Sequence, residues 1–359
     1  MPDFAQMLNV VQTADFLRSC ERVLILTHVR PDGDTVGCAA ALCAALRSIG
    51  KTAYLLPNPG LTRSTEPYFT PYALPENLSP DTFEPSESVT ENFSPDTLEP
   101  SETSAPENIS PVRIVSVDIA TENLFPDNAA PYKGKVDLAM DHHPSFEHFA
   151  RYNMVRPDAA ACGELLYDVI ARLCSITPEI ALPLYVAIST DCGCFSYSNT
   201  TAYTHAVAAA LMRTGIDFRA VNKLCFRTKT RIRIELESAM IRDAAYYDGG
   251  RVTVMAVPHT LIQETGATES DMEELSSLGG QIEGVDCAVT MRELTPGEWK
   301  ISVRTGSRVN ATRVCQQLGG GGHAAAAGCT AHGSLEQVRK QILQAVAQVS
   351  DAVIDETSL

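Results

Sequence analysis

Carboxylate and imidazole side chains stand in groups along the chain, mostly directly after short apolar runs. The first group lies in the segment His28-Val29-Arg30-Pro31-Asp32-Gly33-Asp34, which follows the apolar residues 23–27. Taken singly, each of these residues would more often be a turn or helix-capping residue than a ligand. The whole set contains five carboxylates and three imidazoles: His28, Asp32, Asp34, Asp118, Asp141, His142, His143 and Asp191.

This set of side chains predicts bound divalent metal ions. Five carboxylates cannot lie side by side unless cations neutralise their charge. Oxygen and imidazole ligands suit Mn²⁺, with Mg²⁺ or Co²⁺ as substitutes, better than they suit a metal that prefers thiolates. Two such ions, held about 3.5–4 Å apart, can activate a hydroxide and stabilise the charge that develops on a phosphoryl group. The residues therefore predict two Mn²⁺ ions and the hydrolysis of a phosphoester.

The elements that must position these residues follow a regular rhythm in the first half of the chain. Short apolar runs alternate with helical patterns, the first of which covers residues 35–49, and the runs lie at 23–27, 52–56, 112–117 and 136–140. This rhythm is typical of a parallel sheet flanked by helices. Ligands bind beyond the carboxyl ends of the strands in such a sheet, which is where Asp118 and Asp141 fall.

The second half of the chain predicts a smaller α/β domain. Helical patterns run from residue 163 to residue 242, and they are followed by strand candidates at 251–257, 285–293 and 298–304 and by a closing helix at 335–349. A length of 359 residues also favours two domains. We expect a parallel-sheet domain at 1–225, a linker helix at 226–245, an α/β domain at 246–350 and a tail at 351–359, with the active site in the cleft between the domains.

An acidic repeat interrupts the first domain at residues 75–111. The segment 76–87 recurs as 91–102, and residues 75–111 hold nine acidic residues and no Lys or Arg. Such a composition cannot bury enough apolar surface to offset the entropy of ordering, which predicts a disordered insertion. We interpret it as a tolerated loop expansion, with an acidic docking segment as the alternative.

Composition narrows the range of partners. The formal net charge of −16 disfavours a long nucleic acid, because polyanions are captured by patches of Lys and Arg. Eleven cysteines without a CxxC pair indicate reduced thiols. No apolar run approaches the roughly 20 residues of a membrane-spanning helix. We expect a cytoplasmic protein that acts on a small substrate and does not bind membranes.

A glycine-rich segment in the second domain forms another candidate binding site. Residues 319–328 read GGGGHAAAAG and follow a strand that ends in Arg304. Backbone without side chains can approach an anion closely, and Arg304 and His323 can add polar hydrogen bonds. The alanine run predicts a helix, whose N-terminus would also attract an anion. The segment indicates a phosphate or nucleotide clamp, with a flexible linker as the alternative.

These motifs, in this order, resemble those of the DHH phosphoesterase superfamily with its C-terminal DHH-associated domain. The resemblance covers nearly the whole chain except the acidic repeat. It is strongest for the branch of bifunctional oligoribonucleases that also dephosphorylate 3'-phosphoadenosine 5'-phosphate (pAp). The resemblance implies degradation of short oligoribonucleotides to mononucleotides, conversion of pAp to AMP and, at the level of the family, a homodimer.

The resemblance also implies a role for each residue of the motifs. His28, Asp32 and Asp118 would hold one metal ion. The other ion would be held by Asp34, Asp118, His142 and Asp191, so that Asp118 bridges the two. His143 would face the substrate phosphate, and Asp141 would orient the two histidines. The far phosphate of the nucleotide would bind Arg304, Gly321, Gly322 and His323.

Departures from the family pattern leave the substrate open between pAp and short oligonucleotides. The family often has Thr where this chain has Cys192, and polar or basic residues where it has Ala324 and Ala325. Alternatives are a phosphodiesterase for cyclic dinucleotides or their linear products and an inorganic pyrophosphatase, which the glycine-rich segment disfavours. A further alternative is a non-catalytic regulator that binds nucleotides. Such a protein would lack some of the metal ligands, and this chain has all of them.

Overall fold

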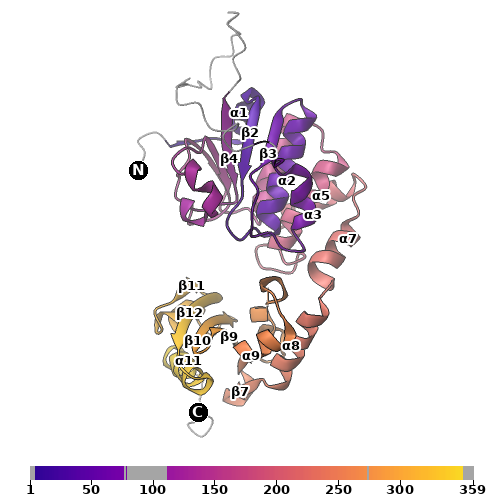
Figure 1. Cartoon of the computed structure of the whole chain (residues 1–359). Coiled ribbons are helices and arrows are strands. Elements are labelled where there is room, and N and C mark those ends of the chain that lie inside the picture. The colour runs from indigo at the N-terminus through magenta and orange to yellow at the C-terminus, as the bar shows by residue number, and fades with distance from the viewer. Residues whose placement is uncertain (1–4, 77, 79–110, 273–274, 351–359) are drawn as a thin grey trace, which may run out of the picture. The chain divides into compact units, whose positions relative to one another are not determined.

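The computed structural model describes residues 5–76, 78, 111–272 and 275–350. The chain forms two compact units that divide between Thr228 and Lys229 (Figure 1). The sequence-based domain limits, and the cleft expected between the domains, stay predictions. The tail at 351–359 and almost all of the acidic repeat lie outside the described residues. None of the helices described is both long and apolar enough to cross a membrane.

The first unit is built on a six-stranded sheet in which every neighbouring pair of strands is parallel, as predicted. The strand order is β1 (Gln6–Met7), β6 (Tyr152–Val155), β5 (Leu138–Asp141), β4 (Val112–Val117), β2 (Arg22–Leu26) and β3 (Thr52–Leu55). The sequence did not predict β1 and β6. The first has only two residues, and a buried polar residue, Asn153, interrupts the apolar run of the second.

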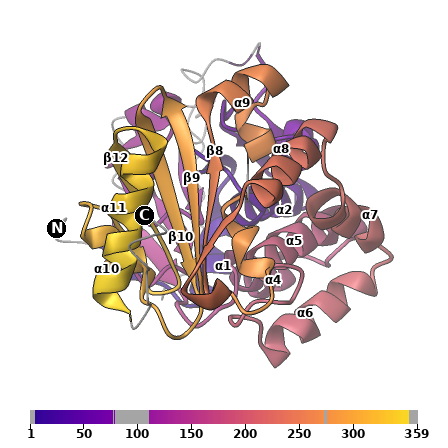
Figure 2. The ribbon, with the colours of Figure 1, turned by 90° about the horizontal axis from the view of Figure 1, so that it is seen from below.

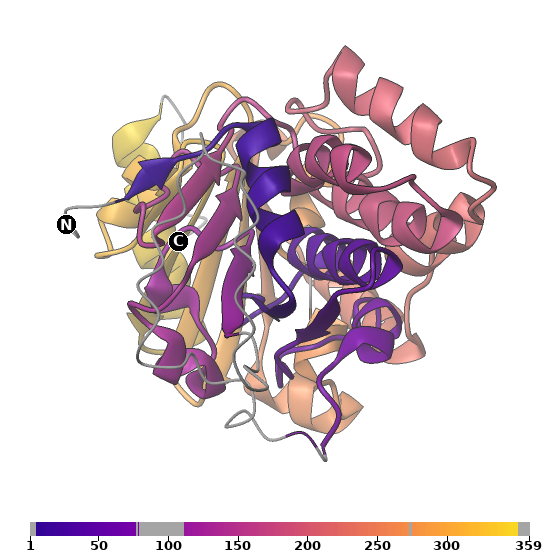
Figure 3. The same ribbon diagram turned by 90° about the horizontal axis from the view of Figure 1, so that it is seen from above.

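Alternate residues of these strands pack on opposite faces of the sheet. On β2, Val23 and Ile25 belong to the core beneath the helices, whereas Leu24 and Leu26 belong to a second core. The helical face is covered by α1 (Val10–Ser19), α2 (Gly33–Ser48) and α4 (Cys162–Leu173), and α5 (Pro178–Asp191) packs on α2 and α4 (Figure 3). The other face carries the 3₁₀ helices η3 (Glu122–Leu124) and η4 (Asp127–Tyr132). The remaining α-helices among the described residues of this unit are α3 (Glu66–Phe69), α6 (Ala202–Met212) and α7 (Phe218–Asn222), with the short helices η1 (Thr70–Tyr72) and η5 (Lys223–Arg227) following α3 and α7.

The second unit is a mixed sheet between two helical layers, which confirms the predicted α/β architecture (Figure 2). The strand order is β11 (Gly321–His323), β12 (Ala326–His332), β10 (Glu298–Thr305), β9 (Cys287–Thr295), β8 (Val252–Val257) and β7 (Ala245–Tyr247). Only β8 and β9 pair in parallel. One face packs on α10 (Ala311–Gln316) and α11 (Leu335–Val349), and the other packs on α8 (Arg231–Arg242) and α9 (His259–Thr265).

The alanine run after the glycines forms a turn (Ala324 and Ala325) and the start of a strand (Ala326 and Ala327), so the helix predicted there is wrong. Residues 326–332 form β12, which pairs with β10 from Arg304↔Ala326 to Glu298↔His332. The helical preference of alanine is below about 1 kcal/mol per residue, and this ladder overrides it. Ala327, Cys329 and Ala331 are buried in alternation, a period of two that the sequence itself contains. The anion site expected at a helix N-terminus here is therefore wrong as well.

Glycines on α2 allow α5 to pack unusually close. A Cβ atom added at Gly33 would lie 2.3 Å from Oγ1 of Thr190, and one added at Gly37 would lie 2.3 Å from the carbonyl oxygen of Pro183. Both distances are far shorter than atoms tolerate, so a larger residue would push the two helices apart. The close contact brings Asp191, the last residue of α5, to the end of α2 where Asp34 lies.

We expect Gly37→Ala to lower the free energy of unfolding by about 1–3 kcal/mol, because the added methyl group overpacks the α2–α5 contact. Urea unfolding followed by circular dichroism measures this. The matched control is Gly280→Ala, since that glycine has ordinary backbone angles and open space around it. Equal stability of the two variants would contradict the packing argument.

Candidate metal centre

The structure brings the predicted metal-binding residues together at the carboxyl ends of three neighbouring strands. His28 and Asp32 follow β2, Asp118 follows β4, and Asp141 is the last residue of β5. Ligand atoms fall into three groups, each lying within 4.8 Å of one another: Asp118, His142 and His143; His28, Asp32 and Asp118; Asp34, His142 and Asp191.

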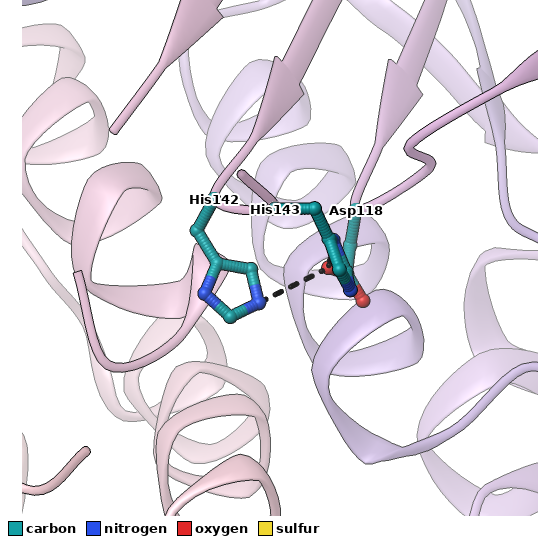
Figure 4. A group of neighbouring side chains, drawn as sticks. All are labelled: Asp118, His142 and His143. Atoms are coloured by element: carbon teal, nitrogen blue, oxygen red, sulfur yellow. Dashed lines mark ion pairs between the residues drawn. The ribbon is translucent and has the colours of Figure 1, made fainter. Parts of the chain in front are cut away.

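Asp118, like His142, belongs to two of these groups (Figure 4). Its Oδ2 atom lies 4.0 Å from Nε2 of His28, and its Oδ1 atom lies 3.7 Å from Nε2 of His142. Its φ of 56° is in the left-handed region, a strained conformation that is concentrated at functional sites. Oδ1 is buried and has no hydrogen-bond partner among the described residues. A buried carboxylate oxygen in this state fits a cation as its partner.

Asp34 is held between the N-termini of two helices. It is the second residue of α2, and its carboxylate accepts hydrogen bonds from the first two backbone N–H groups of α4, those of Cys162 (2.7 Å) and Gly163 (3.0 Å). The N-cap residue of α4 is Ala161, which makes no side-chain cap, so Asp34 supplies the cap from 128 residues away. Both helix N-termini favour a negative charge at this position.

A thiol completes the hydrogen bonding of Asp34. Cys38 lies one turn further along α2, is fully buried, and donates from Sγ to Oδ1 of Asp34 over 3.2 Å. Together with the two backbone donors it fixes the orientation of the carboxylate. Oδ2 of Asp34 then lies 3.8 Å from Nε2 of His142.

Asp32 combines a structural role with its place in the cluster. Its Oδ1 atom caps α2 by accepting from the N–H groups of Asp34 (3.0 Å) and Thr35 (3.1 Å). The same atom lies 3.7 Å from Nε2 of His28. Asp32 therefore caps α2, as its place in the sequence suggests, and also lies close to His28.

Asp141 organises the two histidines that follow it. Its Oδ1 atom accepts from the N–H groups of His142 (2.5 Å) and His143 (2.8 Å) and from Nδ1 of His143 (2.7 Å). Nδ1 of His142 lies 3.1 Å from the carbonyl oxygen of Ala159, which places the proton on Nδ1 and leaves Nε2 able to bind a metal. That Nε2 atom lies 3.6 Å from Oδ2 of Asp191.

Electrostatics in the cluster favour a bound cation. Burial raises the pKa of Asp34 and of Asp118 well above the usual range of a carboxyl group, and repulsion from neighbouring carboxylates raises both further. Burial raises the pKa of Asp191 in the same direction. A divalent ion would replace this repulsion with attraction. The oxygen and imidazole donors therefore fit divalent metal ions.

The predicted clamp residues of the second unit lie on one face of its sheet. Arg304 of β10 pairs with Ala326 of β12, which in turn pairs with His323 of β11. Directly paired residues point to the same face, so Arg304 and His323 flank the small side chain of Ala326, with their backbones roughly 10 Å apart. His323 is exposed and Arg304 is half-buried.

The glycines of this segment differ in what the fold demands of them. Gly319 and Gly322 have φ values of 73° and 144°, which disfavour any other residue. A Cβ atom at Gly320 would lie 2.2 Å from the carbonyl oxygen of Gly328. Gly321 has an ordinary φ and open space, so the packing of the chain does not explain its missing side chain.

Sequence reasoning missed the three donors around Asp34. The thiol of Cys38 could have been found, because residues four apart lie on the same face of a helix. The backbone donors at Cys162 and Gly163 left no signal, since only the tertiary packing brings α4 to α2.

The parallel sheet and its carboxylate and imidazole cluster define a class of enzymes that act on phosphate esters with the help of divalent metal ions. Residues 22–188 match the N-terminal domain of the DHH family, and residues 249–351 match the DHHA1 domain. The chain belongs to the DHH phosphoesterase family, and it is accordingly a hydrolase of phosphoester bonds.

Individual relatives agree with this family. The chain is 30% identical to the bifunctional oligoribonuclease and PAP phosphatase of Thermus thermophilus over 357 residues, which cover 96% of this chain and 95% of the relative. It is 23% identical to the probable bifunctional oligoribonuclease and PAP phosphatase of Streptococcus mutans over 204 residues, or 56% of this chain and 65% of the relative. An exopolyphosphatase-related protein from Bacteroides fragilis has a similar structure, with a TM-score of 0.77, 20% identity and coverage of 94% of this chain and 95% of that one. At this identity the likeness shows the fold alone.

We expect Cys38→Ala to weaken Mn²⁺ binding about tenfold or more, because a partner that orients Asp34 is lost. Cys38→Ser should bind Mn²⁺ nearly as well as the wild type, since its hydroxyl can donate in the same place. Titration calorimetry with the metal-free protein measures both affinities. Cys43→Ala is the control, because that buried thiol on the same helix bonds to the carbonyl oxygen of Ala53. Equal affinities for the Ala and Ser variants at position 38 would contradict the role of the thiol.

Proposed function

We propose that this hydrolase acts on small nucleotides, degrading short oligoribonucleotides to mononucleotides and dephosphorylating pAp to AMP. The observation that carries the proposal is the cluster around Asp118, because its carboxylates and imidazoles suit the hydrolysis of a phosphoester. The choice of substrate is supported by the Thermus thermophilus relative, which bears this pair of activities in its name and matches nearly the whole chain.

The cluster would hold two metal ions, with Mn²⁺ favoured over Mg²⁺ or Co²⁺. The two sets would be His28, Asp32 and Asp118 for one ion, and Asp34, Asp118, His142 and Asp191 for the other. When bound, such a pair supplies an activated water molecule and stabilises charge on the phosphoryl oxygens. The distances from Asp118 to His28 and His142 support its role as the shared ligand.

His143 would donate to the substrate phosphate or to the leaving oxygen. Its hydrogen bond to Asp141 raises its pKa, so the imidazole stays protonated at higher pH than usual. Its side chain is 44% exposed and can reach a substrate, whereas Asp141 is fully buried and can only hold it in place. A protonated imidazole in this position can serve as a general acid.

The second unit would bind the far phosphate of the nucleotide. Arg304 and His323 project from the same face of the sheet, and the backbone at Gly321 and Gly322 lies on its exposed edge. A guanidinium group and an imidazole give polar hydrogen bonds to a phosphate. A second anchoring point of this kind would favour short substrates over long ones.

The first test is a panel of substrates with Mn²⁺-loaded protein: pAp, a 5'-phosphorylated diadenylate, pyrophosphate and a cyclic dinucleotide. We expect AMP from the first two, resolved by chromatography. Loss of a residue that only hydrogen-bonds to a metal ligand reduces activity roughly 10- to 100-fold. Asp118→Asn should reduce turnover by more than this, because it removes a proposed ligand of both ions. Turnover of only pyrophosphate or only the cyclic dinucleotide would replace the proposal with one of those activities.

The glycine-rich segment gives a second test. We expect Gly321→Ala to raise the KM for pAp about tenfold, since each such factor corresponds to about 1.4 kcal/mol of lost binding. Its melting temperature should match the wild type, because no atom of the chain occupies the space. Gly320→Ala is the contrasting variant and should lower the melting temperature. An unchanged KM for Gly321→Ala would argue against a phosphate at this edge.

A further inference from the structure

The loop that follows Asp191 has an unusual backbone. Gly193, Cys194 and Phe195 are consecutive and have φ values of 52°, 53° and 64°. Residues other than glycine avoid this left-handed region, and runs of such residues are rarer still. Strained backbone is concentrated at functional sites, where the surroundings hold it in place.

Hydrogen bonds and ring contacts fix this loop. The N–H of Cys194 donates to the carbonyl oxygen of Ser189 over 2.7 Å. Nδ2 of Asn199 donates to the carbonyl oxygen of Asp191 over 3.1 Å. Phe195 stacks on His205 with ring centroids 5.3 Å apart. Contacts within the chain itself therefore hold the loop in this shape.

The loop carries an exposed tyrosine whose ring packs near Asp191. Tyr197 is 57% exposed, and its ring packs so closely on Gly193 that a Cβ atom there would lie 2.4 Å from two ring carbons. Gly193 is two residues beyond Asp191, whose Oδ2 atom lies 3.6 Å from Nε2 of His142.

We propose that Tyr197 is the stacking platform for the nucleobase of the substrate. This inference rests on the proposed function, because it requires a nucleotide whose phosphate lies at the cluster. Aromatic rings bind bases by stacking, and stacking tolerates any base, as an enzyme for oligoribonucleotides of mixed sequence requires. A rigid loop provides the ring without a cost of ordering it on binding.

The test compares pAp with the abasic 2-deoxyribose 3,5-bisphosphate as substrates of the Mn²⁺-loaded full chain. Tyr197→Leu should raise the KM for pAp by about 5- to 150-fold, the range that stacking on one aromatic side chain provides. The KM for the abasic compound and both kcat values should stay close to those of the wild type. Tyr197→Phe should behave as the wild type, because it keeps the ring.

Two controls separate stacking from a structural effect. Tyr246→Leu removes another exposed tyrosine, 49% exposed, from β7 of the second unit and should leave the KM for pAp unchanged. The rise in melting temperature that Mn²⁺ causes should be the same in Tyr197→Leu and the wild type. An unchanged KM for pAp in Tyr197→Leu, or an equal rise for both substrates, would overturn the inference. Failure of the wild type to hydrolyse pAp would instead overturn the proposed function.

Discussion

The repulsion between buried carboxylates is the constraint on which the first unit depends. Asp34 and Asp118 are almost completely buried close to one another, and their pKa values are raised because the charged forms are unfavourable there. Three donors compensate Asp34, whereas Oδ1 of Asp118 has none among the described residues. Divalent cations would relieve this repulsion, so the same unfavourable burial that costs stability favours metal binding.

Close helix packing makes this arrangement possible. The glycines of α2 let α5 approach, and a Cβ atom at Gly163 would lie 2.8 Å from Cβ of Ala187, so α4 also packs tightly on α5. Three helices therefore meet where Asp34 and Asp191 lie. The backbone donors of α4 reach Asp34 at this meeting point, since α2 and α4 both pack closely on α5. The geometry of the candidate metal centre is thus a consequence of small residues at helix contacts.

In the second unit a sheet positions the candidate phosphate-binding residues, whereas in the first unit helix contacts position Asp34 and Asp191. Strand pairing fixes Arg304 and His323 on one face, with a small alanine between them. The backbone conformation or close packing of this segment requires glycine at positions 319, 320 and 322. At Gly321 the chain leaves space that it does not fill. In both units hydrogen bonds and strand pairing hold these candidate residues in place, so little entropy would be lost in binding the small nucleotide that we propose as the substrate.

The sequence by itself determined the parallel sheet, the α/β second unit and the carboxylate and imidazole set at the strand ends. Those features are local, because apolar runs and the residues that follow them can be seen without knowing any contact. Only the tertiary structure decided which residues surround Asp34, since Cys162 lies 128 positions away along the chain. It also decided that the alanine run forms a turn and the start of a strand, because pairing with β10 outweighs a small intrinsic preference for helix. The spacing of residues does not say which distant segments will pair or pack together, which is why these contacts had to be seen in three dimensions.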